Sequence, residues 1–284
     1  MKLWLDGVEK AVERFSFSGG EIQVRINDLP FIFNDAFIEQ NIRSSDDLME
    51  VLLVTNAVRQ HSGHGHLSVN LCCPYLPYAR QDRVCCEGEA LSLQVICDII
   101  NSQNYATVET WDVHSDVALA LLRNHHDVPL EIIFEGVDFF DIYGACNLIS
   151  PDRGASKKTE RLAKKFGMNW LQAEKHRDPR TGEITHTQVH FEKAHKLLDK
   201  FGWNLPFLIV DDICDGGRTF IEIAKAPGFG NHPKIWLYVT HGIFSKGLKC
   251  LQEAGIERVF SPNPWPVENF LIEKDTSFLT VLEL

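Results

Sequence analysis

The sequence has no long apolar segment and no basic stripe. Nowhere do about 18 uncharged apolar residues follow one another, and the N-terminus MKLWLDGVEKAVERF lacks the apolar core of a signal peptide. Its 28 Lys and Arg are outnumbered by 39 Asp and Glu, which gives a formal net charge of −11. General nucleic-acid binders need a basic surface to displace counterions from phosphates. We therefore expect a cytoplasmic protein that binds neither nucleic acid nor a membrane.

The eight cysteines include no Cys-x-x-Cys motif, and nothing indicates export, so we expect no disulfides. The adjacent pairs Cys72–Cys73 and Cys85–Cys86 offer four thiols for zinc. Neighbouring cysteines rarely ligate one ion together, and reduced thiols are the interpretation we favour. The segment HSGHGH (61–66) is a second metal candidate. A helix is expected to end at Gly63, so a solvated C-cap loop is favoured there.

Apolar strand-like runs alternate with helical patterns along all 284 residues. In the first half the strands are LSVNLCC and ATVETWDV, and the helices are SSDDLMEVLLVTNAVRQ with Ser45 as N-cap, SLQVICDIINSQ and VALALLRNH. In the second half the strands are GACNLIS, FLIVDD, KIWLYVT and ERVFSP, and the helices are ASKKTERLAKKFG, TFIEIAKA and FSKGLKCLQEAG. This alternation predicts an α/β fold of mostly parallel sheets with helices on both faces. Two similar domains are expected, 1–137 and 138–284.

Four polar segments follow predicted strands. They are WDVHSD (111–116), SPDRGASKK (150–158), VDDICDGGRT (210–219) and THGIFS (240–245). In α/β folds, ligands bind at the carboxyl ends of the strands, where N–H groups at helix N-termini favour anions. The binding residues are therefore expected in these segments.

The segment 210–219 has the composition of a phosphate site. Gly216 and Gly217 let the backbone bend and approach an oxyanion closely. Thr219 adds a hydroxyl donor at the start of a helix, and the guanidinium of Arg218 can form two hydrogen bonds to a phosphate. These residue types together predict a phosphate cradle.

The two acids before that turn need a different partner. Asp211 and Asp212 would repel phosphate, so sugar hydroxyls or a metal ion are the groups they suit. A hydroxylated sugar that carries a phosphate satisfies both parts of the segment. The structural alternative is that Asp215 only caps the helix beside a flexible glycine turn.

A strand that ends in two acids and runs into a glycine and threonine turn resembles the phosphoribosyl-binding motif of type I phosphoribosyltransferases and of the related ribose-phosphate pyrophosphokinases. The other segments favour the pyrophosphokinases. PYLPYARQDRV (74–84) resembles their ATP-site segment, FSGGEIQVRI (17–26) their adenine-contact segment, WDVHSD their metal-binding histidine segment and SPDRGASKK their second metal-site loop; THGIFS also matches. The matches keep the family's order over residues 15–245.

The resemblance implies a fold and a reaction. The fold is two phosphoribosyltransferase-like domains. The reaction moves the diphosphoryl group of ATP to the anomeric hydroxyl of a ribose phosphate, and AMP leaves. Mg²⁺ would be held at His114 and Asp152, although histidine is an unusual ligand for so hard an ion. Arg80 and Gln81 would hold ATP, together with His114.

The resemblance also assigns residues outside these strand ends. Phe17 would stack on adenine, and Glu21 would accept a hydrogen bond from the adenine amine. In the family these two residues come from a neighbouring subunit, which implies a homo-oligomer with a shared adenine site. Lys175 and Arg177, in AEKHRDPRTGEI (173–184), occupy the places of the Lys-x-Arg pair on the family's mobile catalytic loop. Their charges would embrace the transferring diphosphate. As a bare pattern, such a charge run is more often a solvated loop.

The sequence departs from the family at the loop assigned to the acceptor's phosphate. The family pattern is Asp-Thr-x-Gly-Thr, whereas this chain has Asp215, Gly216, Gly217, Arg218 and Thr219. Loss of the threonine opens space, and the arginine adds a phosphate donor. Ribose 5-phosphate or a close analogue is the acceptor we favour. The alternative is a larger acceptor such as ADP-ribose, whose product would serve to rebuild a nicotinamide dinucleotide.

The chain departs from the family at two further places, and its motifs disfavour two rival functions. Gly19 stands where the family has Asp or Asn, and the stretch 117–136 does not follow the family, so its hexamer and its regulation are not expected. A phosphoribosyltransferase would have no need of the ATP segments. A catalytically silent regulatory homologue would not be expected to keep Lys175, Arg177 and His114.

Overall fold

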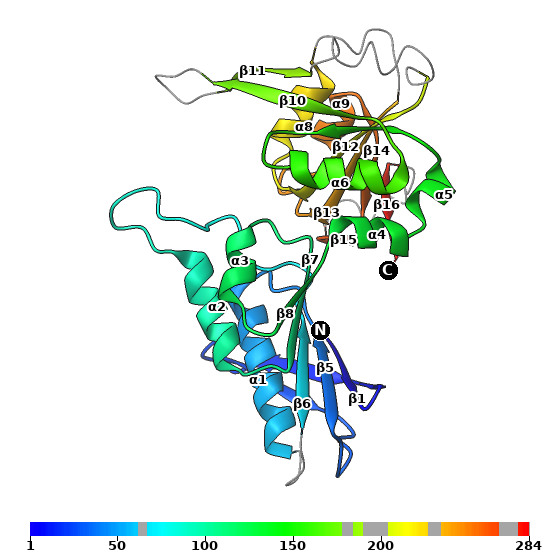
Figure 1. Cartoon of the computed structure of the whole chain (residues 1–284). Coiled ribbons are helices and arrows are strands. Elements are labelled where there is room, and N and C mark those ends of the chain that lie inside the picture. The colour runs from blue at the N-terminus through cyan, green and yellow to red at the C-terminus, as the bar shows by residue number, and fades with distance from the viewer. Residues whose placement is uncertain (62–66, 178–183, 190–203, 227–233, 267–277, 284) are drawn as a thin grey trace. The chain divides into compact units, whose positions relative to one another are not determined.

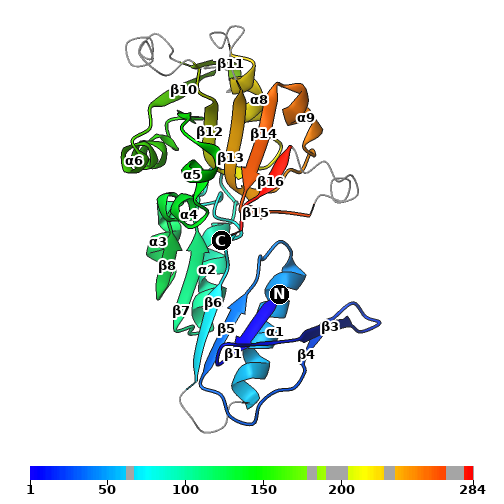
Figure 2. The ribbon, with the colours of Figure 1, turned by 90° about the vertical axis from the view of Figure 1, so that its right-hand side faces the viewer.

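Two compact units make up the chain, Met1–Pro129 and Leu130–Leu284, and each has its own hydrophobic core. The computed structural model describes residues 1–61, 67–177, 184–189, 204–226, 234–266 and 278–283. Each unit contains a mostly parallel sheet flanked by helices (Figures 1 and 2), which confirms the predicted α/β class. No helix within these ranges is long and apolar enough to cross a membrane.

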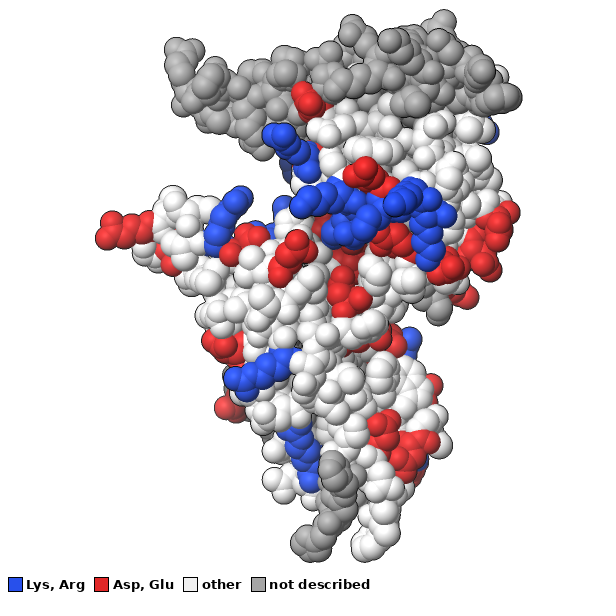
Figure 3. All heavy atoms as spheres, viewed as in Figure 1, with Lys and Arg blue, Asp and Glu red and all other residues white. Residues whose placement is uncertain are grey.

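The division falls at Pro129, earlier than the expected boundary at residue 137. The reason is α4 (Leu130–Gly136), which packs on α6 (Ser156–Phe166) of the second unit. Nε of Arg161 lies 2.6 Å from Oε1 of Glu131, and Nζ of Lys165 lies 2.6 Å from Oε2 of Glu135. Figure 3 shows the basic side chains of α6 gathered beside acidic ones on this face. These ion pairs and packing contacts assign α4 to the second unit.

The first unit is built on a six-stranded sheet. Its strand order is β2 (Val8–Lys10), β1 (Lys2–Leu5), β5 (Asp35–Glu39), β6 (Ser68–Cys72), β7 (Thr107–Trp111), β8 (His125–Val128). The last four strands are parallel, and β1 is antiparallel to both of its neighbours. The antiparallel strands β3 (Val12–Ser16) and β4 (Ile22–Ile26) form a separate hairpin that projects from the unit (Figure 2).

The helices of the first unit lie on one face of its sheet, which corrects the expectation of two covered faces. They are α1 (Ser45–His61), α2 (Ser92–Ser102) and α3 (Asp116–Leu121). The chain visits β5, β6, β7 and β8 in spatial order, and right-handed crossovers in one direction put every helix on the same side (Figure 1). Burial alternates accordingly along β6: Val69 and Leu71 are buried, whereas Ser68 and Asn70 are half-buried.

The second unit is built on an eight-stranded sheet. Its order is β11 (Ile184–Val189), β10 (Trp170–Arg177), β9 (Asn147–Ser150), β12 (Phe207–Cys214), β13 (Ile235–Gly242), β14 (Ile256–Ser261), β16 (Leu279–Val281), with β15 (Asn263–Pro264) paired to β13. All pairs except β10–β11 are parallel. Every residue of β13 is buried, as expected of a central strand covered on both faces. The other helices within the described part of this unit are α5 (Phe139–Tyr143), α8 (Arg218–Ala224) and α9 (Lys249–Glu253).

The strand order of the second unit reverses between β9 and β12. From β9 the chain passes through α6 to β10 on one side, and from β12 it passes through α8 to β13 on the other side. The carboxyl ends of β9 and β12 therefore form a topological switch point. Ligands of open α/β sheets bind at such a point, because the two crossover loops separate there and leave a crevice.

Local chemistry explains where the predicted elements shifted. Ser44, not Ser45, caps α1, because its Oγ accepts the N–H of Asp47 at 3.1 Å. The helix predicted from residue 244 begins only at Lys249. Phe244 and Gly247 both adopt left-handed φ values, +48° and +72°, which a helix cannot contain.

Candidate active site

The predicted ATP segment lies across the carboxyl ends of β6 and β7 in the first unit. The N–H of Trp111, the last residue of β7, donates to the carbonyl of Pro74 at 3.0 Å. At the other end, the N–H of Leu93 in α2 donates to the carbonyl of Gln81 at 3.3 Å. The backbone of the segment is thus tied to a strand and a helix, while the side chains of Arg80 and Gln81 are exposed.

A hydrogen bond joins this segment to the histidine segment. Oγ of Ser115 donates to Oδ2 of Asp82 at 2.7 Å. The neighbouring His114 is exposed, as are Arg80 and Gln81. The structure therefore brings together three residues that the sequence assigned to ATP, at one edge of one sheet.

The turn that presents His114 is strained and anchored. Asp112 is 2% exposed and has a left-handed φ of +44°, a costly conformation for a residue other than glycine. The next N–H, that of Val113, donates to Oδ1 of Asp127 at 3.1 Å. Strain of this kind persists only where surrounding contacts hold it, and it is typical of binding sites.

The two residues assigned to adenine lie at the tip of the β3–β4 hairpin. Phe17 is 52% exposed, and its N–H donates to the carbonyl of Glu21 at 2.8 Å, which closes the turn. The ring of Phe15 packs edge-on against Phe17 with 5.7 Å between centroids. Figure 2 shows this hairpin projecting beyond the six-stranded sheet of the first unit.

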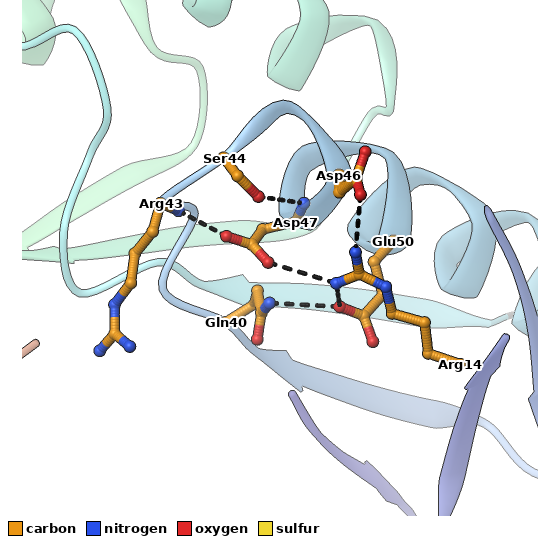
Figure 4. Close-up of polar contacts among 7 residues, drawn as sticks. All are labelled: Arg14, Gln40, Arg43, Ser44, Asp46, Asp47 and Glu50. Carbon is orange, nitrogen blue, oxygen red and sulfur yellow. Dashed lines mark hydrogen bonds and ion pairs between the residues drawn. The ribbon is translucent and has the colours of Figure 1, made fainter. Parts of the chain in front are cut away.

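Arg14 fixes that hairpin to α1. Its guanidinium meets Asp46 at 2.9 Å, Asp47 at 3.5 Å and Glu50 at 3.4 Å (Figure 4). Nε2 of Gln40 adds a 3.4 Å hydrogen bond to Glu50. The sequence alone does not point to Arg14, because its three acidic partners lie more than 30 positions further along the chain.

If the hairpin tip contacts adenine, as the resemblance implies, replacing Arg14 with Met is expected to raise the KM for ATP about fivefold and to leave kcat nearly unchanged. The partly exposed ion pairs contribute about 1 kcal/mol, and their loss lets the hairpin tip move. Steady-state kinetics with varied ATP test this. Lys2→Met, which breaks an exposed ion pair between Lys2 on β1 and Glu39 on β5, is the matched control. Equal KM values for the parent and Arg14→Met would show that Arg14 has no part in presenting the hairpin.

In the second unit, the switch point collects three carboxylates. Asp211 and Asp212 lie inside β12, which runs two residues beyond them to Cys214, and Asp152 follows β9. Burial raises the pKa of Asp211 well above its ordinary value, and the charges of Asp212 and Asp152 and a hydrogen bond with Asp212 raise it further. This crowding of negative charge is what a bound cation or a set of sugar hydroxyls would relieve.

The carboxylate of Asp152 also shapes the loop before α6. Its Oδ1 accepts the N–H groups of Gly154 at 2.9 Å and Ala155 at 3.2 Å. Its backbone carbonyl accepts from the hydroxyls of Ser150 at 2.7 Å and Ser156 at 3.0 Å. Asp152 is thus held at the strand end by both its side chain and its backbone.

Within the described ranges, no group of three or more His, Cys, Asp or Glu side chains is arranged to hold a metal ion by itself. An ion at the switch point would therefore complete its coordination with phosphate oxygens and water, as Mg²⁺ commonly does. His64 and His66, and Gly63 beside them, lie outside the described residues. Of the cysteine pairs considered for zinc, Cys72–Cys73 is buried, whereas Cys85–Cys86 is exposed.

The glycine turn after β12 depends on Gly217. Its φ is +73°, and a Cβ there would lie 2.9 Å from Cδ2 of Leu251. Gly216 has no left-handed φ, and its nearest neighbour would be Cε of Lys246 at 3.5 Å, an ordinary contact. Of the two glycines predicted to form a phosphate cradle, only Gly217 must be glycine, because both its backbone conformation and its packing exclude a side chain.

Gly217→Ala is expected to destabilise the protein by about 2–3 kcal/mol, because a left-handed alanine and an overpacked Leu251 add their costs. Gly216→Ala, the matched variant one residue earlier, is expected to change the free energy of unfolding by less than about 1 kcal/mol. Urea unfolding of both variants tests this. Equal destabilisation by the two substitutions would contradict the geometry.

The arginine of the loop is engaged on its own helix. Nε of Arg218 lies 2.8 Å from Oε1 of Glu222, one turn later in α8. In this arrangement its guanidinium is paired with a carboxylate, and a phosphate would compete for it. Lys246, which the sequence analysis did not single out, lies against Gly216 instead.

The predicted catalytic residues are found in a strand, which corrects the expectation of a loop. Lys175 and Arg177 are within β10, and β11 pairs with it antiparallel, Lys175 opposite Thr187. The register shifts between His176 and Arg177, as at a β-bulge. β11, the partner that makes this polar stretch a strand, was not predicted from the sequence. Residues 178–183 of the expected loop lie outside the described residues.

Curated proteins with similar sequences identify the family. The chain is 30% identical over 267 residues to a ribose-phosphate pyrophosphokinase of Pyrococcus furiosus, an alignment that covers 92% of this chain and 89% of the relative. The chain belongs to the ribose-phosphate pyrophosphokinase family. A family member from Bradyrhizobium diazoefficiens is also 30% identical, over 84% of this chain and 72% of its own length. Residues 7–103 match the model of the N-terminal domain of ribose phosphate pyrophosphokinase.

The solved structures agree on the fold. Phosphoribosylpyrophosphate synthetase from Mycobacterium smegmatis superposes with a TM-score of 0.74 at 22% identity, over 98% of this chain and 88% of that one. The predicted pyrophosphokinase family and its fold of two phosphoribosyltransferase-like domains are confirmed, as is the enzyme class of diphosphotransferase.

Proposed function

We propose that the protein transfers the β,γ-diphosphoryl group of ATP to the anomeric hydroxyl of ribose 5-phosphate and releases AMP. The observation that carries this proposal is the switch point of the second unit, where Asp211 and Asp212 precede a glycine turn in a member of the pyrophosphokinase family. The carboxylates suit ribose hydroxyls, and the backbone of the turn suits the 5-phosphate.

The first unit supplies the residues for ATP. Arg80 holds the phosphates, and Gln81 and His114 lie on the segments that the Ser115–Asp82 hydrogen bond joins. Phe17 and Glu21 bind adenine from the hairpin tip of a second subunit. The exposure of Phe17, on a hairpin that projects from its own unit in Figure 2, supports a homo-oligomer with a shared adenine site.

A magnesium ion would be held on the second unit by Asp152, and His114 would contribute to the ATP side, as the family motifs imply. When bound, the ion neutralises the charge of the phosphates and orients them for displacement. The raised pKa of Asp211 beside Asp212 and Asp152 fits a site that takes up a cation. Lys175 and Arg177 hold the diphosphate as its charge develops during transfer.

A 5-extended acceptor such as ADP-ribose is the second candidate. Arg218 at the mouth of the loop favours it, since a guanidinium can bind a bridging diphosphate through two hydrogen bonds. The space beside Gly216 does not favour it. That space was expected to be open, but the methylene carbons of Lys246 lie within 3.9 Å of it. Ribose 5-phosphate remains the acceptor that the geometry supports better.

The test is to incubate the protein with ATP and Mg²⁺, offer ribose 5-phosphate or ADP-ribose separately, quantify AMP and weigh the products. The proposal predicts AMP and a diphosphorylated ribose 5-phosphate in equal amounts. If AMP is released only with ADP-ribose, the acceptor is ADP-ribose and the diphosphoryl transfer stands. No AMP with either would contradict the proposed function and leave a phosphoribosyltransferase or a silent homologue.

A further inference from the structure

The turn that follows β13 is built against the glycine turn that follows β12. The carbonyl of Cys214 accepts the N–H groups of both Ile243 and Phe244, at 2.8 and 3.0 Å. Phe244 is 2% exposed, and its ring occupies the place that a Cβ at Gly242 would need, 2.1 Å from Cε2. Buried packing and two backbone hydrogen bonds therefore fix the position of the turn 243–247.

From this turn the side chain of Lys246 passes across Gly216. Its Cε, Cδ and Cγ lie 3.5, 3.6 and 3.9 Å from the point where a Cβ on Gly216 would stand. The stem covers bare backbone, and the ammonium is one bond beyond Cε. A residue with a γ atom at position 216 would meet this stem, so the glycine and the lysine form a complementary pair.

The surroundings of the two nearby cations differ. Arg218 is paired with Glu222 at 2.8 Å, whereas no carboxylate in the described part of the chain forms an ion pair with Lys246. The lysine is exposed, so its ammonium can reach an anion at the glycine turn without first breaking a salt bridge.

We propose that Lys246 recognises the acceptor's phosphate and sets the preference for a phosphomonoester. This inference rests on the proposed function. The ammonium is a compact point charge, and its attraction grows with the charge of its partner. A terminal phosphomonoester carries nearly two negative charges near neutral pH, and each phosphate of a bridging diphosphate carries one. Lys246 therefore favours ribose 5-phosphate over an acceptor whose 5-phosphate is esterified.

Lys246→Met tests the inference, because methionine keeps a flexible apolar stem over Gly216 and removes the charge. By calorimetric titration without ATP, its Kd for ribose 5-phosphate is expected to rise on the order of tenfold to a hundredfold. Lys246→Arg should stay within a few-fold of the parent. Lys249→Met is the matched control, because Lys249 is 86% exposed on α9 and pairs only weakly with Glu253 at 3.8 Å.

The kinetic measurement separates the inference from the proposed function. With ATP varied at saturating ribose 5-phosphate, Lys246→Met should keep the parent's KM for ATP, while its KM for ribose 5-phosphate rises. If the parent releases AMP with ribose 5-phosphate and Lys246→Met matches its Kd and KM, the inference fails and the proposed function stands. If the parent neither binds ribose 5-phosphate nor releases AMP, the proposed function fails.

Discussion

Lys175→Ala is expected to lower kcat on the order of a hundredfold without changing the melting temperature. Loss of one preorganised donor to a developing charge typically costs about 3 kcal/mol of transition-state stabilisation. The backbone pairing of β10 with β11, which sets Lys175 opposite Thr187, does not depend on that side chain. The fold is therefore expected to survive the truncation. AMP release and a thermal melt of the same preparation measure both quantities.

The control for Lys175 is another lysine truncated in the same unit. Lys249→Ala removes an exposed side chain from α9 and is expected to leave kcat unchanged. Binding of ribose 5-phosphate by Lys175→Ala should equal that of the parent, because the role proposed for this lysine is in the transition state. A turnover within about threefold of the parent would contradict the catalytic role.

Asp211→Asn is expected to reduce turnover by about a hundredfold and, at neutral pH, to raise the melting temperature by about 2–4 °C. The first effect follows from the loss of a charged acceptor for ribose hydroxyls or a cation. The second follows from the partly buried negative charge that Asp211 shares with Asp212 and Asp152, since asparagine removes one member of the repelling group. Asp141→Asn, an exposed change on α5, should move the melting temperature by less than about 1 °C.

The stabilising effect of Asp211→Asn should depend on pH. The folded-state pKa of Asp211 is raised, so the folded protein binds its proton more tightly than the unfolded chain does. The contribution of Asp211 to stability is therefore fully present below the unfolded pKa of about 4 and is lost as the pH rises towards the folded pKa. The melting-temperature difference between Asp211→Asn and the parent should grow with pH from about pH 4 upward. A difference that is constant or shrinks would contradict the raised pKa.

The sequence predicted the parallel core well, because long apolar runs with helical patterns between them leave few alternatives. The prediction placed four parallel strands and their ends correctly to within a few residues: β9, β12, β13 and β14. The same reasoning did not place the helices of the first unit on one face. Which face a helix covers depends on the spatial order of the strands, and the local pattern of FLIVDD or LSVNLCC does not encode that order.

Short strands were the other omission, both the parallel β5 and β8 at the sides of the first sheet's core and several antiparallel strands. β3, β4 and β11 are strands because each pairs with a neighbouring strand, and not because of apolar periodicity in their sequences. β3 is mostly exposed, and the stretch around Lys175 is polar. For such segments, tertiary pairing decides the structure over local composition.

Some residues of the candidate site could likewise be predicted from the sequence, and others could not. Residues on strand ends, such as His114, Asp152 and Asp211, could be predicted because topology alone brings such ends together. Arg14 and Lys246 could not, because each acts on a residue about 30 positions away through a contact that only the folded chain creates. The departure at Gly216 was visible in the sequence. Its complement at Lys246 required the structure.

The position of the transferred label tests the central claim most directly. ATP labelled with ³²P at its β-phosphorus is incubated with the protein, Mg²⁺ and ribose 5-phosphate, and the products are separated. Diphosphoryl transfer predicts that all transferred label is on the sugar product and that the AMP released carries none. Labelled ADP, together with a sugar product that has gained only one unlabelled phosphoryl group, would show transfer of the γ-phosphoryl group alone and would contradict the account.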